Sequence, residues 1–119
     1  MNYKKAILVG ININSSEYDF KNSMEELKGL SISLGIEKFN YISQNRDKYD
    51  PQFLIGSGKV KEINDLVIKE NIDLVLFNDT LSGSQLNNLS QNIDAKIMDR
   101  SAIILDIFAK RANTKLAKL

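Results

Sequence analysis

The order in which short apolar runs and helical periods follow one another constrains the fold of this chain most. The run Ala6–Val9 contains no polar residue, which is typical of a strand buried on both faces of a parallel sheet. The run Leu74–Phe77 belongs to the clearest strand of the chain. Between them, apolar residues recur every three or four positions from Phe20 to Leu34, as they do along one face of a helix. Strands that alternate with helices in this way predict an α/β domain.

The same patterns predict the individual elements. We expect a small, open, mainly parallel sheet of four strands, flanked by helices and joined by right-handed crossovers. Asp19 is the expected N-cap of the first helix, and Gly35 is its expected stop. Ser82 and Gln85 form a capping box at the start of a later helix. The expected strands are Ala6–Val9 (ending at Gly10), Ile36–Ile42, Asp73–Phe77 and Ala95–Met98, with a loop over residues 43–52, a short extended piece at Phe53–Ile55 and a last helix over Ser101–Ala112.

The composition excludes several classes of protein. The 119 residues include no cysteine and no histidine, so disulfides, zinc–cysteine sites and Ser-His-Asp chemistry are excluded. No metal site is predicted. The apolar runs are too short to cross a bilayer, and the first residues show no signal peptide. We therefore expect a single cytoplasmic domain that has no membrane partner.

Charge is unevenly distributed along the chain. The net charge is only +1, so no overall field attracts nucleic acid or membranes. Residues 95–119 nevertheless hold six basic and two acidic residues, whereas residues 1–94 hold ten basic and thirteen acidic ones. The last fifth of the chain is therefore its basic end.

The sequence Gly56-Ser57-Gly58-Lys59 suggests a loop that holds phosphate. A P-loop requires a glycine five positions before the Gly-Lys pair and a hydroxyl residue after the lysine. Here those positions are Phe53 and Val60, so the loop is not a P-loop. It remains a candidate ligand or phosphate loop, and its alternative interpretation is a tight strand-to-helix turn that Ser57 caps.

A polar crevice is predicted where the strands end. Ligands of open parallel sheets bind at the carboxyl ends of the strands, and these ends hold Gly10, Asn78, Asp79, Asp99 and Arg100. The Gly56–Lys59 loop is expected nearby. The alternatives are turn chemistry at Asn78 and Asp79 and a local salt bridge between Asp99 and Arg100.

The last helix has more apolar residues than one face needs. Residues 102–109 are apolar except for Asp106, whereas a helix that covers a sheet needs a single apolar stripe. Part of this helix is therefore expected to pack against a second helix, a partner subunit or a domain outside this chain.

Three segments resemble, in order and spacing, those of a known family. "FLIGSGKVKEI", "VLFNDTLSGSQLNNL" and "IMDRSAIILDIFAKRANT" are similar to the signature segments of the amino-terminal domain of HflX-type GTPases. The resemblance runs from about Tyr3 to Leu119. It departs from the family at Gly83, where the family usually has proline, and the helix start there is expected to be looser.

This resemblance implies a function. HflX-type proteins combine such an α/β domain with a helical linker and a GTPase domain, and they bind the large ribosomal subunit, where they are associated with splitting or rescue. Residues 1–112 would be the α/β domain and residues 113–119 the start of the linker. GTP and Mg²⁺ are then expected only with the absent GTPase domain, so no cofactor and no enzymatic activity are expected of this chain. Candidate contacts with ribosomal RNA or the linker are Lys61, Lys110, Arg111, Lys115 and Lys118.

Two other functions stay open on the sequence alone. The crevice and the Gly56–Lys59 loop would suit an independent domain that binds an adenine nucleotide or an RNA phosphate. The apolar last helix would suit a homodimer.

Overall fold

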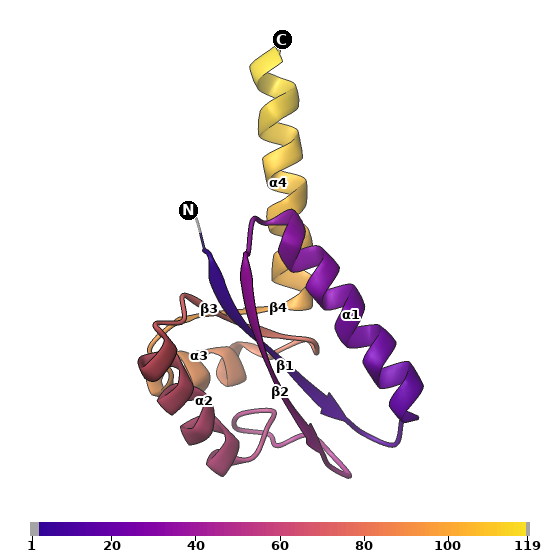
Figure 1. Ribbon diagram of the computed structural model, residues 1–119, viewed down its shortest axis with the longest axis vertical. Coiled ribbons are helices and arrows are strands. Elements are labelled where there is room, and N and C mark those ends of the chain that lie inside the picture. Colours follow the sequence, from indigo (N-terminus) through magenta and orange to yellow (C-terminus); the bar gives the residue numbers. More distant parts are fainter. Residues whose placement is uncertain (1–2, 119) are drawn as a thin grey trace.

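The structure, a computed structural model, describes residues 3–118, and the side chains of residues 3–110. Four strands alternate with four helices in this part of the chain (Figure 1). In chain order they are β1 (Lys5–Asn12), α1 (Glu17–Ser33), β2 (Lys38–Asn45), α2 (Ser57–Glu70), β3 (Leu74–Phe77), α3 (Gly83–Asn92), β4 (Lys96–Asp99) and α4 (Arg100–Lys118).

The four strands form one sheet in the order β2-β1-β3-β4, and every neighbouring pair is parallel. The predicted α/β class and its four-stranded parallel sheet are therefore confirmed. β1 lies between β2 and β3, with Ala6 paired to Phe39 on one side and to Leu74 on the other. Because all strands point the same way, their carboxyl ends share one edge of the sheet.

Alternating side chains divide the core into two layers. Ala6 and Leu8 of β1 belong to the cluster that contains Leu27 of α1 and Ile103 of α4. Ile7 and Val9 belong to the opposite cluster, which is built with helices α2 and α3. Successive side chains of a strand point to opposite faces, so an uninterrupted apolar run serves both layers.

The helix ends follow local sequence signals, with one correction. Ser82 and Gln85 form the predicted capping box, and Gly35 ends α1 with a positive φ of 93°. The predicted N-cap Asp19 is wrong, because Ser16 caps α1 and its Oγ accepts from the Asp19 backbone N–H. Both residue types favour the position, and the chain uses the earlier one.

Two boundaries after α1 also differ from the prediction. β2 runs over Lys38–Asn45 rather than Ile36–Ile42, so residues 43–45 are strand and not loop. Phe53–Ile55 is not extended throughout, because Leu54 has a φ of 69° and forms an isolated antiparallel bridge with Asp50. This bridge folds residues 50–54 into a turn before α2.

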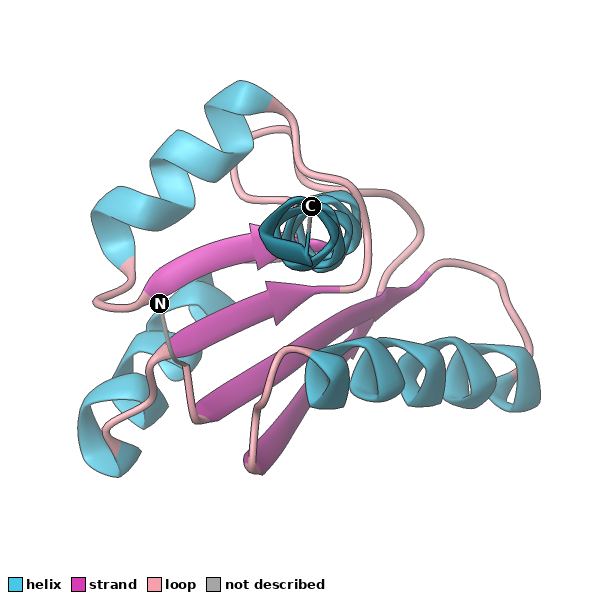
Figure 2. Cartoon of the chain, turned by 90° about the horizontal axis from the view of Figure 1, so that it is seen from above, coloured by secondary structure: helices cyan, strands magenta, loops and turns pink. Residues whose placement is uncertain are grey.

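α4 projects from the body of the domain (Figures 1 and 2). Ile103 is fully buried under the sheet, but Leu105 and Phe108 are 69% and 61% exposed. The excess of apolar residues predicted for this helix is therefore present as an uncovered surface. None of the helices in the described part of the chain is both long and apolar enough to cross a bilayer.

Asp73 ties the amino ends of two central strands together, which gives a prediction for pH dependence. Its Oδ2 accepts the backbone N–H groups of Lys4 and Lys5, each at 3.0 Å, and these bonds lower the pKa of the Asp73 carboxyl. A carboxyl whose pKa is lower in the folded state stabilises the fold above its unfolded pKa, near 3.9, and loses this effect as the pH falls. We expect Asp73→Asn to lower the free energy of unfolding by about 1 kcal/mol at pH 7, since the site is exposed.

The difference from the parent chain should begin to shrink below about pH 4, where the unfolded carboxyl takes up protons, and it should disappear as the pH falls through the lowered pKa of the folded carboxyl. Urea unfolding across the pH range measures it. Asp65→Asn, a change at an exposed helical position, is the matched control and should follow the parent at every pH. A destabilisation by Asp73→Asn that is the same at pH 3 and pH 7 would contradict this account.

Candidate functional site

The residues predicted for one crevice do not form a single site. Gly10 is buried beneath α1, and a Cβ there would lie 2.5 Å from Met24 Sδ and 2.8 Å from Phe20 Cζ. Glycine at this position lets α1 pack close to β1. Because β1 continues to Asn12, Asn12 rather than Gly10 stands at its carboxyl end.

Arg100, the first residue of α4, anchors a polar cluster at the end of β3. Its Nη2 donates to Asn78 Oδ1 at 2.7 Å and to the Ser23 backbone carbonyl at 2.8 Å, and its Nη1 contacts Glu26 Oε2 at 3.3 Å. The Asn78 amide also donates to Ser23 Oγ. These bonds join β3, α1 and α4. They also engage the Arg100 guanidinium, which in the predicted crevice would have been available to bind a nucleotide.

Asp99 does not pair with Arg100, so the predicted local salt bridge is wrong. One Asp99 oxygen accepts from the Leu81 backbone N–H at 2.9 Å, and the other accepts from the Ala102 backbone N–H at 2.8 Å. The carboxylate therefore caps the start of α4 and holds the loop that precedes α3. This is the stabilising arrangement for an acid at a helix N-terminus.

Asp79 lies at the end of β3 and accepts a hydrogen bond from Tyr49. The Tyr49 hydroxyl lies 2.9 Å from Asp79 Oδ1. The pKa of Tyr49 is raised, first by burial and then by this carboxylate. Asp79 Oδ2 is buried, and no protein group bonds to it. The loop after β2 therefore reaches across the sheet edge and covers the end of β3.

The Gly56–Lys59 loop lies at the end of β2, and β1 separates it from Asn78 and Arg100. Gly56 is the N-cap of α2, without a side-chain cap, and its N–H donates to Gln44 Oε1 at 3.0 Å. A Cβ on Gly56 would lie 2.9 Å from Arg46 Nη1. Ser57 is the first helical residue rather than the cap, and Lys59 pairs with Glu62 at 3.0 Å. The chain thus turns tightly here under neighbouring side chains.

The candidate basic contacts are spread over two helices. Lys61 is exposed on α2, and Lys110 is exposed on α4. Arg111, Lys115 and Lys118 follow on α4, but their side chains lie outside the described residues. Among the described side chains, no three acidic groups gather as a metal ion would need.

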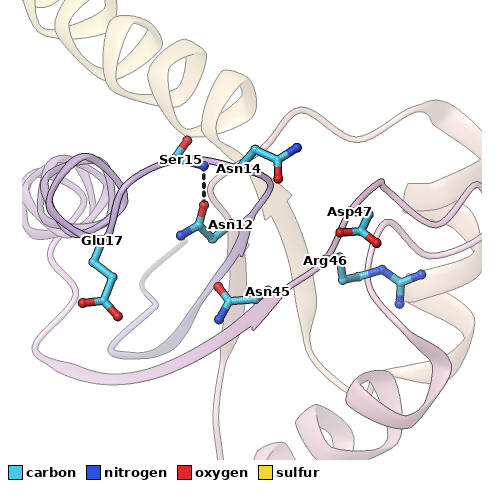
Figure 3. A pocket seen from close by; sticks show the side chains of 7 residues that line it. All are labelled: Asn12, Asn14, Ser15, Glu17, Asn45, Arg46 and Asp47. Carbon is cyan, nitrogen blue, oxygen red and sulfur yellow. Dashed lines mark hydrogen bonds between the residues drawn. The ribbon is translucent and has the colours of Figure 1, made fainter.

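A hollow of about 350 Å³ opens between the carboxyl ends of β1 and β2, and the sequence did not predict it (Figure 3). We call it the amide hollow. It is lined by Asn12, Asn14, Ser15, Glu17, Asn45, Arg46 and Asp47. The signal in the sequence is Asn12 and Asn14 after the first apolar run and Asn45 after the second expected strand. It was missed because both strands were predicted to end two or three residues too early.

Comparison with known proteins identifies the family. Residues 21–109, which are most of the chain, match the protein family described as "GTP-binding GTPase N-terminal". The chain belongs to this family. The predicted HflX-type amino-terminal domain is thereby confirmed, because the curated relatives of the chain are GTPases of the HflX type.

Three such relatives show how much of an HflX protein the chain covers. GTPase HflX of Flavobacterium psychrophilum is 41% identical over 99% of this chain and 29% of its own length. GTPase HflX of Caldanaerobacter subterraneus subsp. tengcongensis is 40% identical over 94% and 26%. The Escherichia coli protein is 34% identical over 98% and 27%. The chain therefore spans less than a third of the length of these HflX relatives.

A solved structure shares the fold. A GTP-binding protein from the hyperthermophilic archaeon Sulfolobus solfataricus, in complex with GDP, aligns with a TM-score of 0.64 and 20% identity. The match covers 89% of this chain and 30% of that one. It supports the α/β arrangement of the HflX-type domain.

The contacts of Arg100 predict which pairs of residues are energetically coupled. In a double-mutant cycle, Asn78→Ala and Arg100→Ala should couple by about 1–2 kcal/mol, because they share two hydrogen bonds. Asp99→Ala and Arg100→Ala should couple by less than about 0.5 kcal/mol, because they have different partners. Urea unfolding of the single and double variants measures both energies. Stronger coupling for the neighbouring pair Asp99 and Arg100 would contradict the geometry.

Proposed function

We propose that this domain is a non-catalytic ribosome-binding and regulatory module, which acts with a GTPase domain on the large ribosomal subunit in ribosome splitting, rescue or biogenesis. The observation that carries the proposal is membership of the GTPase amino-terminal family over residues 21–109. The coverage of its HflX relatives supports it, because less than a third of their length corresponds to this chain. The remaining length leaves room for the linker and the GTPase domain.

GTP and Mg²⁺ are proposed to bind outside this chain. The Gly56–Lys59 loop lacks the first glycine and the hydroxyl residue of a P-loop. Lys59 is already paired with Glu62, and Gly56 is closed in by Gln44 and Arg46. These contacts suit a structural turn better than a phosphate cradle.

α4 is proposed to carry the contact with the rest of the protein. Leu105 and Phe108 expose most of their side chains, and Leu105 also lines a groove of about 660 Å³ beside the edge strand β4. Exposed apolar patches next to a groove are typical of surfaces that another segment covers. Residues 113–119 would then begin the helical linker, and residues 1–112 would form the domain.

The basic residues are proposed to contact ribosomal RNA. Lys61 and Lys110 are exposed, and four of the six basic residues after position 94 lie at 110–118. Lysine and arginine bind phosphates by releasing counterions, so the affinity of such contacts depends on salt. Lys110, Arg111, Lys115 and Lys118 are the proposed phosphate contacts, together with Lys61.

The proposed function predicts how this chain behaves toward GTP. The 119-residue chain should neither hydrolyse GTP nor bind it with micromolar affinity, because the P-loop residues are lacking. Isothermal calorimetry and a phosphate-release assay measure the two properties. Micromolar affinity together with turnover that Lys59→Ala abolishes would refute the proposed division of labour.

The second prediction concerns the basic end. In a longer chain that includes the linker, Lys110→Glu with Arg111→Glu should weaken binding to large subunits strongly at low salt. The slope of log affinity against log salt should fall by about one unit for each lost phosphate contact. Folding stability should change little, because Lys110 is exposed on α4 and exposed substitutions usually change stability by no more than about 0.5 kcal/mol.

The matched control reverses two exposed lysines elsewhere, Lys38→Glu with Lys69→Glu, and changes the net charge equally. It should leave binding nearly unchanged. If both double variants weaken binding alike, the effect is one of net charge. If the first lowers the melting temperature and leaves binding intact, the basic end is structural and the RNA contact at α4 is wrong.

A further inference from the structure

The amide hollow is formed by two chain segments that leave neighbouring strands (Figure 3). On one side β1 ends at Asn12, whose Oδ1 accepts the Ser15 backbone N–H at 3.0 Å and thereby shapes the turn into α1. Asn14 in this turn has a φ of 58°, a conformation that asparagine tolerates better than most residues. On the other side β2 ends at Asn45, which pairs in register with Asn12. The register thus brings amides from both strand ends to one place.

The polar groups of the hollow are largely unused by the protein. Among the described residues, the amides of Asn14 and Asn45 have no hydrogen-bond partner, and neither has the NH₂ group of Asn12. Among the described contacts, the Arg46 side chain donates through Nε alone, to the Lys48 carbonyl at 3.1 Å, while the Arg46 backbone N–H donates to the Asn12 carbonyl at 3.1 Å. Several asparagines elsewhere are bonded within the protein. Asn78 bonds to Ser23 and Arg100, and further bonds engage the amides of Asn64, Asn88 and Asn92. Asn22, Asn40, Asn71 and Asn87 also have no side-chain hydrogen bond among the described residues, but they belong to four different elements, namely α1, β2, the end of α2 and α3. The hollow thus gathers three amides with open hydrogen-bonding capacity in one place.

The charges of the hollow determine the kind of ligand it suits. Glu17 and Asp47 bring two negative charges and Arg46 one positive charge. A phosphate would meet net repulsion there, because like charges close together are unfavourable. An uncharged ligand that offers adjacent donors and acceptors would instead pair with the amides and with the carboxylates.

A nucleobase has this chemistry. Its edge presents a donor beside an acceptor, which one asparagine amide pairs with at both atoms, and carboxylates accept from exocyclic amines. The volume of about 350 Å³ is at the lower end of small-ligand sites, which measure roughly 300–1,000 Å³. It would admit a base with its sugar but not a duplex. No aromatic side chain lines the hollow, so recognition would come from the edge of the base rather than from stacking.

We infer that the amide hollow binds an unpaired nucleobase by its hydrogen-bonding edge, with single-stranded RNA as the source of the base. The choice of RNA as the source rests on the proposed function. The choice of a base rests on the free amides and on the two carboxylates. The phosphates of the strand would remain outside the hollow.

Side-chain amide NMR signals of the 119-residue chain test this inference. Short single-stranded RNA homopolymers should shift the signals of Asn12, Asn14 and Asn45, and an RNA duplex and inorganic phosphate should not. Asn14→Gly with Asn45→Ala removes two amides and keeps the positive φ accessible at position 14. This double variant should bind the preferred homopolymer about tenfold more weakly, since a paired amide edge discriminates by about that factor.

Asn87→Ala is the matched control, because Asn87 is an exposed amide on α3 outside the hollow. It should leave affinity unchanged, and backbone NMR spectra should show all variants folded. Equal affinities of the parent, the double variant and the control would overturn the inference. Shifts caused equally by phosphate or by duplex would also overturn it, because the ligand would then not be a base.

The failure of this inference is distinguishable from failure of the proposed function. If large subunits bind the longer, linker-containing chain but the three amide signals stay unshifted with every RNA, the hollow is not a base site and the proposed function stands. If free nucleosides shift the amides while neither RNA nor large subunits bind, the base chemistry holds, but RNA as its source and the proposed function both fail.

Discussion

The burial of β1 on both faces is the constraint on which the rest of the structure depends. Residues 6–9 of this strand are at most 1% exposed, and β1 pairs with β2 on one side and β3 on the other. Helices must therefore cover both faces, and the strand ends beside β1 must meet at one edge. Gly10 completes the arrangement, because only a residue without a side chain lets Phe20 and Met24 of α1 pack so closely on the strand.

The sequence could predict the elements whose signals are local. Apolar runs predicted β1 and β3, because residues 6–11 of β1 and all of β3 are buried, and the capping box predicted the start of α3. The end of β2 could not be predicted in this way. Residues 43–45 are polar, and they are strand because they pair in register with residues 10–12 of β1. Pairing with a distant strand overrides local preference, especially at an edge strand that is half exposed.

The candidate site was less predictable, since its partners are far apart in the chain. The adjacency of Asp99 and Arg100 suggested an ion pair, but Arg100 bonds to Ser23, which lies 77 positions away. Asp99 turns instead to backbone N–H groups that need a cap. Sequence spacing indicates which groups reach the same sheet edge. It does not indicate which of them bond to one another, because the packing of α1 and α4 decides that.

The domain presents two surfaces of opposite character at opposite ends. The amide hollow lies at the carboxyl edge of the sheet, whereas α4 starts at that edge, runs back across the sheet and projects beyond its amino edge (Figure 1). α1 contacts both the hollow and the start of α4 at this carboxyl edge. Glu17 in its first turn lines the hollow, and Ser23 and Glu26 hold Arg100 at the base of α4. The ligand proposed for the hollow and the partner proposed for α4 would therefore use different surfaces, while one helix contacts both the hollow and the base of α4.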